Sequence, residues 1–405
     1  MEIKFMPLRQ NGNAVKVNIR ILIALVFLLM ALLSHQAFSN TVDFTKVNPE
    51  ELRLNIAQKK IPSVVNAFDN RVKAFKTSIS QAKNLTELTQ FVIRDGKALF
   101  TDAIKQFHSR GILDDRPLYW ARLQMVNALK SNPLFVQLLP MQQKKVLWRF
   151  ELLSRGAEHI HFNKSSRKKI LILGFDPLLL DKNIQQSNAS GVTALALDDM
   201  FISNQGVSAE IESLIIPVRF EGFDQGMIEE LLKPYISDID MLVTLSMGKT
   251  AFELTSNAYL KRNKEAFDNV KLTASSGFAV SPQLKNSTLK GPAMIKGSLP
   301  VSAMLSAPGK FSMKANINSL TNFDKSVANL KEREKGIKQE LYSGAEINHL
   351  ANELSYRSLL LRDKYNPLLP VGHIITPRIN SYQPKKSEQI MLQVKQMLTN
   401  ALSEI

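Results

Sequence analysis

The sequence contains no cysteine among its 405 residues. This absence excludes disulfide bonds, thiolate metal sites and a cysteine nucleophile. No block of five or more like charges occurs either, although the formal net charge is +16. The basic residues are therefore typical of a solvated surface, and we expect no nucleic-acid partner and no cofactor. With 44% apolar and 22% charged residues, the chain has the composition of an ordinary globular protein.

Long apolar runs are also scarce, and the clearest one lies near the N-terminus, at 21–33 ("ILIALVFLLMALL"). Basic residues precede this run, and the small residues Ala37 and Ser39 follow it. A basic start, a short apolar core and small residues are typical of a secretory signal, since a spanning helix needs about 20 apolar residues. We predict a signal peptide at 1–39, with a single membrane anchor as the alternative. Cleavage would leave an exported protein, periplasmic or secreted, without a stable anchor.

The next segment has a helical pattern. Apolar residues recur there at spacings of three and four, as in Val65, Phe68, Val72, Phe75 and Ile79. We predict a helical N-terminal domain at 40–165.

The end of this segment contains the stretch "HIHF", with His159 and His161. Two histidines one residue apart could supply two metal ligands, but no third ligand stands near them in the sequence. We therefore expect surface or packing histidines, and no metal.

At Lys168 the pattern changes to apolar runs typical of strands, separated by helical segments. Strands alternating with helices predict an α/β fold with a mostly parallel sheet sandwiched by helices. We place this domain at 166–385, with a long surface excursion at 271–320, and a C-terminal helix at 386–405. Sites in such sheets lie at the carboxyl ends of strands, here after Leu173 and Leu245.

Six stretches of this half resemble, in the same order, the pyroglutamyl peptidase type I family. They are "LILGFDP", "SNASG", "IIPVRFEGF", "LVTLSMGKTAFEL", "GPAMIKGSLP" and "VGHIITP". The family consists of cysteine exopeptidases that remove N-terminal pyroglutamate. The resemblance implies the family's phosphorylase/hydrolase-like fold and a pocket that binds a pyroglutamyl-like peptide N-terminus. Its expected lining residues are Gly174, Phe175, Asp176, Pro177 and Asn188.

The same resemblance implies a cysteine nucleophile, a histidine base and a glutamate. Laid over "HLANELSY", the nucleophile position falls on Ala351. On "VGHIITP" the base position falls on Ile375, and after "LSMG" the acid position falls on Thr255. None of these three side chains can perform the family's chemistry.

Other residues could replace the missing groups. Glu253 stands two residues before Thr255, and Ser355 with His373 forms a conceivable nucleophile and base. A serine in a helix more often packs or bonds its own helix, and His349 is expected to be a capping or surface residue.

The sequence therefore predicts an exported, divergent family member that lacks the catalytic Cys and His. We expect it to be catalytically inactive and retained for ligand or partner binding. An active pyroglutamyl peptidase (omega-peptidase) with a rebuilt centre is the alternative, and a third hypothesis places the function in the helical domain.

Overall fold

The structure, a computed structural model, describes residues 43–163, 167–262, 268–272, 281–316 and 349–405. The predicted signal peptide at 1–39 lies outside the described residues. The described residues from Thr45 onward belong to one compact unit. Within these ranges, no helix is both long and apolar enough to cross a membrane.

The N-terminal segment is helical, as predicted. Its helices are α2 (Pro49–Leu52), α3 (Leu54–Lys60), α4 (Pro62–Val65), α5 (Asp69–Gln81), α6 (Leu85–Arg110), α7 (Arg116–Lys130), α8 (Pro133–Gln137) and α9 (Pro140–Leu153). On α5, the apolar stripe predicted from the spacing is buried at Val72, Phe75 and Ile79. Helix α6 begins after Asn84, whose side chain accepts a hydrogen bond from the Glu87 N–H. It ends at Gly111, whose φ of 61° favours glycine.

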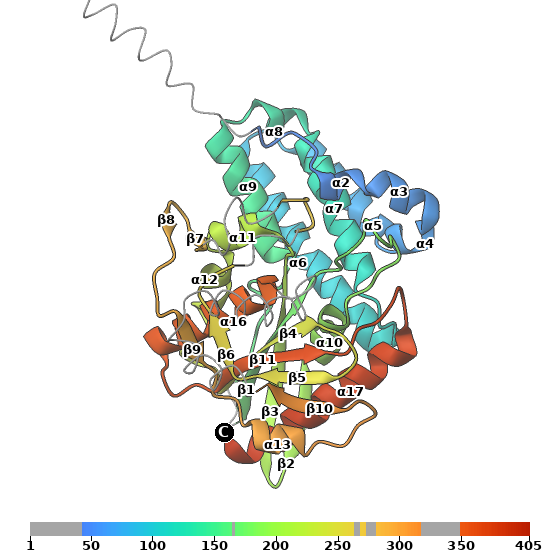
Figure 1. Cartoon of the computed structure of the whole chain (residues 1–405). Coiled ribbons are helices and arrows are strands. Elements are labelled where there is room, and N and C mark those ends of the chain that lie inside the picture. The colour runs from blue at the N-terminus through green and yellow to red at the C-terminus, as the bar shows by residue number, and fades with distance from the viewer. Residues whose placement is uncertain (1–42, 164–166, 263–267, 273–280, 317–348) are drawn as a thin grey trace, which may run out of the picture. The chain divides into compact units, whose positions relative to one another are not determined.

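A seven-stranded sheet forms the centre of the following segment (Figure 1). Its strands are β1 (Lys168–Phe175), β2 (Met200–Asn204), β3 (Val207–Ile216), β4 (Met241–Met247), β5 (Phe252–Thr255), β10 (Met313–Asn316) and β11 (Val371–Thr376). They lie in the order β10-β5-β11-β4-β1-β3-β2. Strands β11, β4, β1 and β3 are mutually parallel, whereas β5 and β2 pair antiparallel with their inner neighbours. The predicted α/β fold with a mostly parallel sheet is confirmed.

Helices cover the two faces of this sheet. Helix α10 (Ala189–Leu197) packs on β1 and β3, while α16 (His349–Tyr365) packs on β4 and β11. Gly174 faces α10, because a Cβ there would lie 2.4 Å from the Ser190 carbonyl oxygen. Its neighbour Phe175 shares a cavity with Ala351 of α16. Successive residues of a strand point to opposite faces, so α10 and α16 lie on opposite sides of β1.

The remaining elements surround these layers. They are α11 (Phe220–Asp224), α12 (Met227–Leu232), α13 (Val301–Leu305), α17 (Pro384–Ala401), the 3-10 helix η1 (Leu402–Glu404), and the small pairs β6 (Asn257–Tyr259) with β9 (Met294–Lys296) and β7 (Gln283–Leu284) with β8 (Ser287–Thr288). The described parts of the predicted excursion at 271–320 thus contain short strands and one short helix. Helix α17 packs on α10 and α13.

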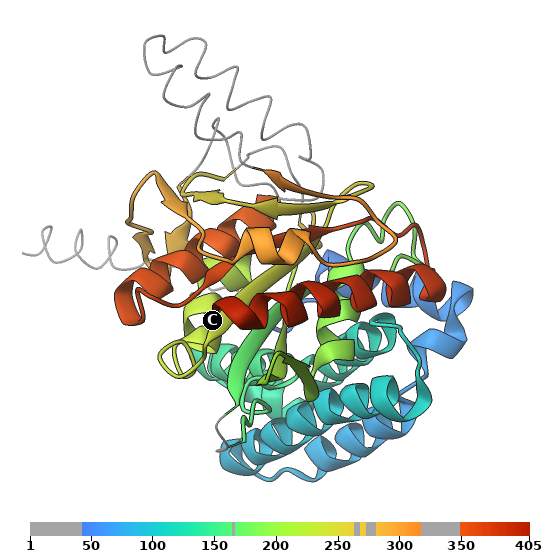
Figure 2. The ribbon, with the colours of Figure 1, turned by 90° about the horizontal axis from the view of Figure 1, so that it is seen from below.

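One apolar core runs through both segments. It includes Phe75 and Phe150 from the helices and Ile172 and Leu242 from the sheet, each fully buried. Figure 2 shows the blue and cyan helices gathered on one side of the green strands and the orange and red elements on the other. The core is continuous across position 165. The boundary between two domains near 165 stays a prediction.

Candidate functional site

Asp176, which follows β1, lies in a buried charged network rather than in an open pocket. Its carboxylate contacts the Arg122 guanidinium at 2.9 Å and that of Arg155 at 2.6 Å. Burial alone would raise the pKa of the Asp176 carboxyl, but the two guanidinium groups outweigh burial and hold the pKa below its ordinary value. The helical segment therefore supplies the counter-charges at the carboxyl end of β1.

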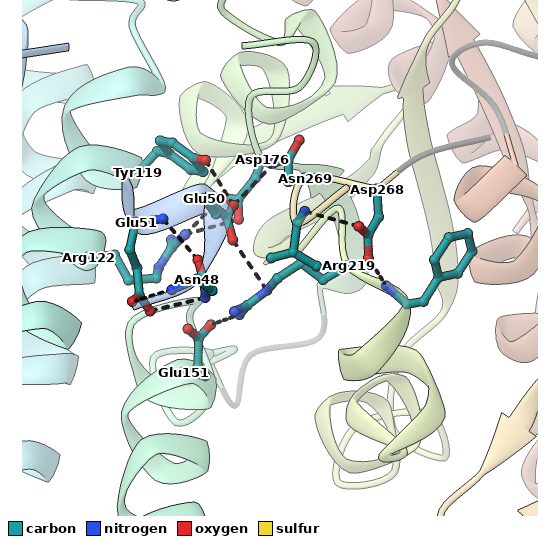
Figure 3. A network of polar contacts seen from close by, with 12 residues as sticks. Asn48, Glu50, Glu51, Tyr119, Arg122, Glu151, Asp176, Arg219, Asp268 and Asn269 are labelled. Carbon is teal, nitrogen blue, oxygen red and sulfur yellow. Dashed lines mark hydrogen bonds and ion pairs between the residues drawn. The ribbon is translucent and has the colours of Figure 1, made fainter. Parts of the chain in front are cut away.

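The network continues to the end of β3 (Figure 3). Arg219 lies 2.8 Å from the Glu151 carboxylate and 3.6 Å from that of Glu50. The Tyr119 hydroxyl donates to Glu50 at 2.8 Å. Burial raises the pKa of Glu50, although Arg219 opposes the shift. Side chains from α2, α7 and α9 thus meet the carboxyl ends of β1 and β3, where α/β proteins bind their ligands.

The remaining residues of the expected pocket also have partners within the chain. Asn188 caps α10 by accepting from the Ser190 N–H at 3.0 Å, and its amide donates to the Asp176 carbonyl at 2.8 Å. The Pro177 carbonyl accepts from the Asn269 amide at 2.9 Å. As shown above, Gly174 provides the close approach of α10 to β1.

Ala351 lies at the start of α16 and lines a small cavity. The cavity has a volume of about 10 Å³, and Phe175, Asn188 and Ser246 also line it. This volume holds about one water molecule. The side chain of Ala351 is only 3% exposed, so the nucleophile position of the resemblance is buried beneath the loop after β1.

Ile375 and Thr255 lie on neighbouring strands, close to the same cavity. Ile375 of β11 is in register with Ser246 of β4 and with Glu253 of β5. Thr255 is in register with His373, two residues before Ile375 along β11. Ala351 therefore shares the cavity with Ser246, Ile375 is the register partner of Ser246 on the adjacent strand, and Thr255 lies one strand further out. Glu253 forms an ion pair with Lys314 at 3.1 Å.

His373 is buried and hydrogen-bonded at both ring nitrogens. Its Nε2 lies 2.8 Å from the Ser246 hydroxyl, and its Nδ1 lies 2.7 Å from the Thr244 hydroxyl. The Thr244 hydroxyl also lies 3.2 Å from the Gly372 carbonyl oxygen. A hydroxyl can donate or accept, so Thr244 and Ser246 satisfy both ring nitrogens in either neutral tautomer.

The acid–base character of this histidine is weak. Burial lowers the pKa of His373 to about 3, so the ring is neutral at physiological pH. An efficient general base needs a pKa near the operating pH. Thr244 is neutral and stands where a carboxylate would stabilise the imidazolium in a triad.

His373 pairs with Ser246 and not with Ser355, because the described hydroxyls of Thr244 and Ser246 already occupy both ring nitrogens. Ser355 is buried within α16. His349 begins α16, but its side chain lies outside the described residues. Ser246 was missed by sequence reasoning because its proximity to His373 depends on the register of β4 with β11, which no local pattern reveals.

Comparisons with known proteins give two kinds of similarity. Residues 34–151 match the family described as PA0049 N-terminal domain, and residues 169–271 match the PA0049 C-terminal domain family. Over 415 aligned positions the chain is 26% identical to "Uncharacterized protein PA0049" of Pseudomonas aeruginosa. This alignment covers 78% of this chain and 75% of that protein.

Among solved structures, the chain is similar to a mutant pyrrolidone carboxyl peptidase from Pyrococcus furiosus, with 17% identity and a TM-score of 0.40. That match covers 58% of this chain and 99% of the peptidase. Pyroglutamyl peptidase I from Bacillus amyloliquefaciens matches with 16% identity and a TM-score of 0.40, covering 58% of this chain and 98% of that enzyme. What the site does is therefore inferred from its own residues.

Proposed function

We propose that this chain is an exported, catalytically inactive protein on a pyroglutamyl-peptidase-like sheet, retained for binding a partner. The observation that carries the proposal is Ala351, which stands at the nucleophile position of the resemblance and lines a cavity of about 10 Å³. A methyl group cannot attack a carbonyl carbon. An enzyme that uses this mechanism but lacks its nucleophile keeps only the rate acceleration from substrate positioning and oxyanion stabilisation. That acceleration is about 10³- to 10⁴-fold over the reaction in water.

The closed loop after β1 supports the same proposal. Asp176 is held by Arg122 and Arg155, and Asn188 by its contacts at the start of α10. The cavity beside Ala351 holds about one water molecule, so a pyroglutamyl ring would fit there only after the lining residues had moved. We therefore propose a binding surface elsewhere in the unit.

The helical segment offers such a surface. A pocket of about 600 Å³ lies among α3, α5 and α7, within the size range of ligand sites. Side-chain amides line it, including Asn55, Gln58, Gln124 and Asn127. The Asn127 Oδ1 atom is buried and, within the described part of the chain, has no hydrogen-bond partner. Amides can both donate and accept, so the pocket suits a peptide segment of a partner protein.

A cross-linking experiment tests this surface in cells. A photo-cross-linking amino acid replaces the exposed Gln58 in the pocket, and in a second strain it replaces the exposed Glu388 of α17. We expect a discrete cross-linked species from position 58 only. Equal patterns from both positions would place partner binding elsewhere.

A second experiment tests export. Sequencing the N-terminus of the protein purified from the same cells checks the proposed cleavage after Ser39.

The alternative function is hydrolysis by a serine centre. The observation that favours it is the 2.8 Å separation of the Ser246 hydroxyl from His373 Nε2, which is within the range of a nucleophile and its base. The buried, weakly basic ring and the small cavity oppose this alternative.

Turnover of a fluorogenic pyroglutamyl amide separates the two functions. The wild-type chain is compared with the Ser246→Ala variant, purified in parallel so that contaminants are matched. We expect equal fluorophore release by the two proteins. A wild-type rate at least tenfold above that of Ser246→Ala would establish the serine centre instead.

A further inference from the structure

A second cluster of chemically active side chains lies away from the cavity at Ala351. It consists of His159, Asp198, Asp199 and Glu212, whose potential ligand atoms all lie within 4.8 Å of one another. His159 follows α9, the two aspartates join α10 to β2, and Glu212 lies on β3. Sequence reasoning missed this set because it sought a third ligand near "HIHF" in the chain, whereas the fold brings the carboxylates from 39 to 53 residues away.

Two buried oxygens in this cluster make no hydrogen bond of good geometry with a described residue, although His159 lies 3.3 Å from one of them, Asp198 Oδ2. Glu212 is 1% exposed and Asp198 is 0% exposed. Among the residues that the structure describes, Glu212 Oε2 and Asp198 Oδ2 accept no hydrogen bond. An unpaired buried carboxylate oxygen is costly, so buried charges are normally paired or coordinate a metal. A cation bound among these side chains would compensate the two oxygens.

The histidine has the orientation of a metal ligand. Its Nε2 faces Asp198 Oδ2 at 3.3 Å, and its Nδ1 lies 3.5 Å from the Thr101 hydroxyl. A metal-bound histidine usually directs its second nitrogen to such an outer partner. The other oxygen of Asp198 accepts the Ser213 N–H at 2.6 Å, which fixes that carboxylate. His159 and Asp198 are thus each contacted by a neighbouring group, the Thr101 hydroxyl and the Ser213 N–H respectively.

We propose that His159, Asp198, Asp199 and Glu212 bind one divalent transition-metal ion, with Zn²⁺ as its probe. One imidazole nitrogen with carboxylate oxygens suits Zn²⁺ and similar ions better than Ca²⁺ or Mg²⁺, which prefer oxygen alone. Bound ligands of Zn²⁺ lie roughly 3.4 Å apart at metal–ligand distances near 2.1 Å, so small side-chain rotations complete the site. The ion would join the end of α9 to β3 and to the turn between α10 and β2.

The test uses the untagged mature chain, stripped of metal and titrated with Zn²⁺ in a calorimeter. Asp199→Asn is the main variant: Asp199 is exposed, and its φ of 57° is one that asparagine adopts readily. Glu212→Gln is the second variant. The matched control is Glu210→Gln, which removes a buried carboxylate two residues earlier on β3, where it binds Asn163. His161→Ala controls for the neighbouring histidine.

We expect one Zn²⁺ per wild-type chain and a Tm that rises with Zn²⁺ until the site is full. Asp199→Asn should weaken binding by at least about tenfold, since outer-shell changes alone cost 10- to 100-fold. Glu212→Gln should abolish the Tm rise, while Glu210→Gln and His161→Ala keep both effects. Unchanged affinity in Asp199→Asn, absence of wild-type binding, or loss of binding in His161→Ala would overturn the assignment. We expect Asp199→Asn to fold, since the side chain is exposed, and this variant tests the site even if Glu212→Gln does not fold.

Discussion

At the residue scale, His373 is the side chain whose properties the fold changes most. Its pKa falls from 6.5 to about 3 through burial. Below pH 6.5 the unfolded chain binds a proton that the folded chain does not, so this histidine's contribution to stability is complete above pH 6.5 and is lost progressively toward pH 3. The loss is about 1.4 kcal/mol per pH unit, or about 3 kcal/mol at pH 4.

Urea unfolding at pH 7 and pH 4 measures this contribution. The His373→Gln variant cannot titrate and keeps hydrogen-bonding capacity toward Ser246 and Thr244. We expect its free energy of unfolding to fall between the two pH values by about 3 kcal/mol less than that of the wild-type chain. Identical pH dependence in both proteins would mean that His373 titrates normally and is accessible as a base.

The sequence singles out some residues near the cavity but not others. The order of short motifs along the chain points to Ala351 and Ile375, and their assignment as nucleophile and base positions stays a prediction. In the structure, Ala351 shares a cavity with Ser246, and Ile375 is in register with Ser246. Ser246 itself stands between two ordinary strand residues in "LSMG". Only the pairing of β4 with β11 makes it a partner of His373. Glu212 was missed for the same reason, because its neighbours come from three different elements.

At the scale of elements, Asp176 joins two helices of the N-terminal segment to the end of β1. Removing one partner of a buried ion pair costs about 3 to 5 kcal/mol, because the remaining charge is left without compensation. We expect Asp176→Asn to lower the free energy of unfolding by this amount, since Arg122 would lose its carboxylate partner and Arg155 would keep only Glu151. Chemical denaturation of the purified variant measures the change.

The matched control is Asp69→Asn on α5. Asp69 pairs with Lys73 at 2.6 Å, but 40% and 70% of these two side chains are exposed. An exposed pair contributes at most about 1 kcal/mol. Similar losses in both variants would show that Asp176 is solvated and available to a ligand, contrary to the closed network described above.

Regular elements were more predictable than the network that joins them. The apolar runs of β1 and β4 and the stripe of α5 are local patterns, so their type follows from the sequence. The antiparallel strands β2, at one edge of the sheet, and β5, beside the other edge strand β10, carry weaker patterns and were not separately expected. Long-range pairs such as that of Arg122 with Asp176, which are 54 residues apart, have no local signature.

At the scale of the whole molecule, the helical segment and the sheet share one core and one charged network. We therefore expect the described unit to unfold in a single cooperative transition. Both tryptophans, Trp120 and Trp148, lie in the helical segment. Their fluorescence therefore reports on that segment and on its contact with α12, where the Trp148 indole donates to Glu230. Amide hydrogen exchange of β4 reports on the sheet.

The two probes should give the same unfolding midpoint in urea. Separate midpoints would show that the segments are independent domains. In that case, the contacts of Asp176 and Arg219 with the helices would be too weak to couple them.

The proposed lack of catalysis requires the Ser246 and His373 pair to be inert. Its most direct test is incubation of the folded chain with a fluorophosphonate, which phosphonylates activated serines, followed by intact mass and peptide mapping. We predict an unmodified mass, equal to that of Ser246→Ala treated in the same way. One adduct per chain at Ser246, absent after denaturation in urea, would contradict the account and identify an active serine hydrolase.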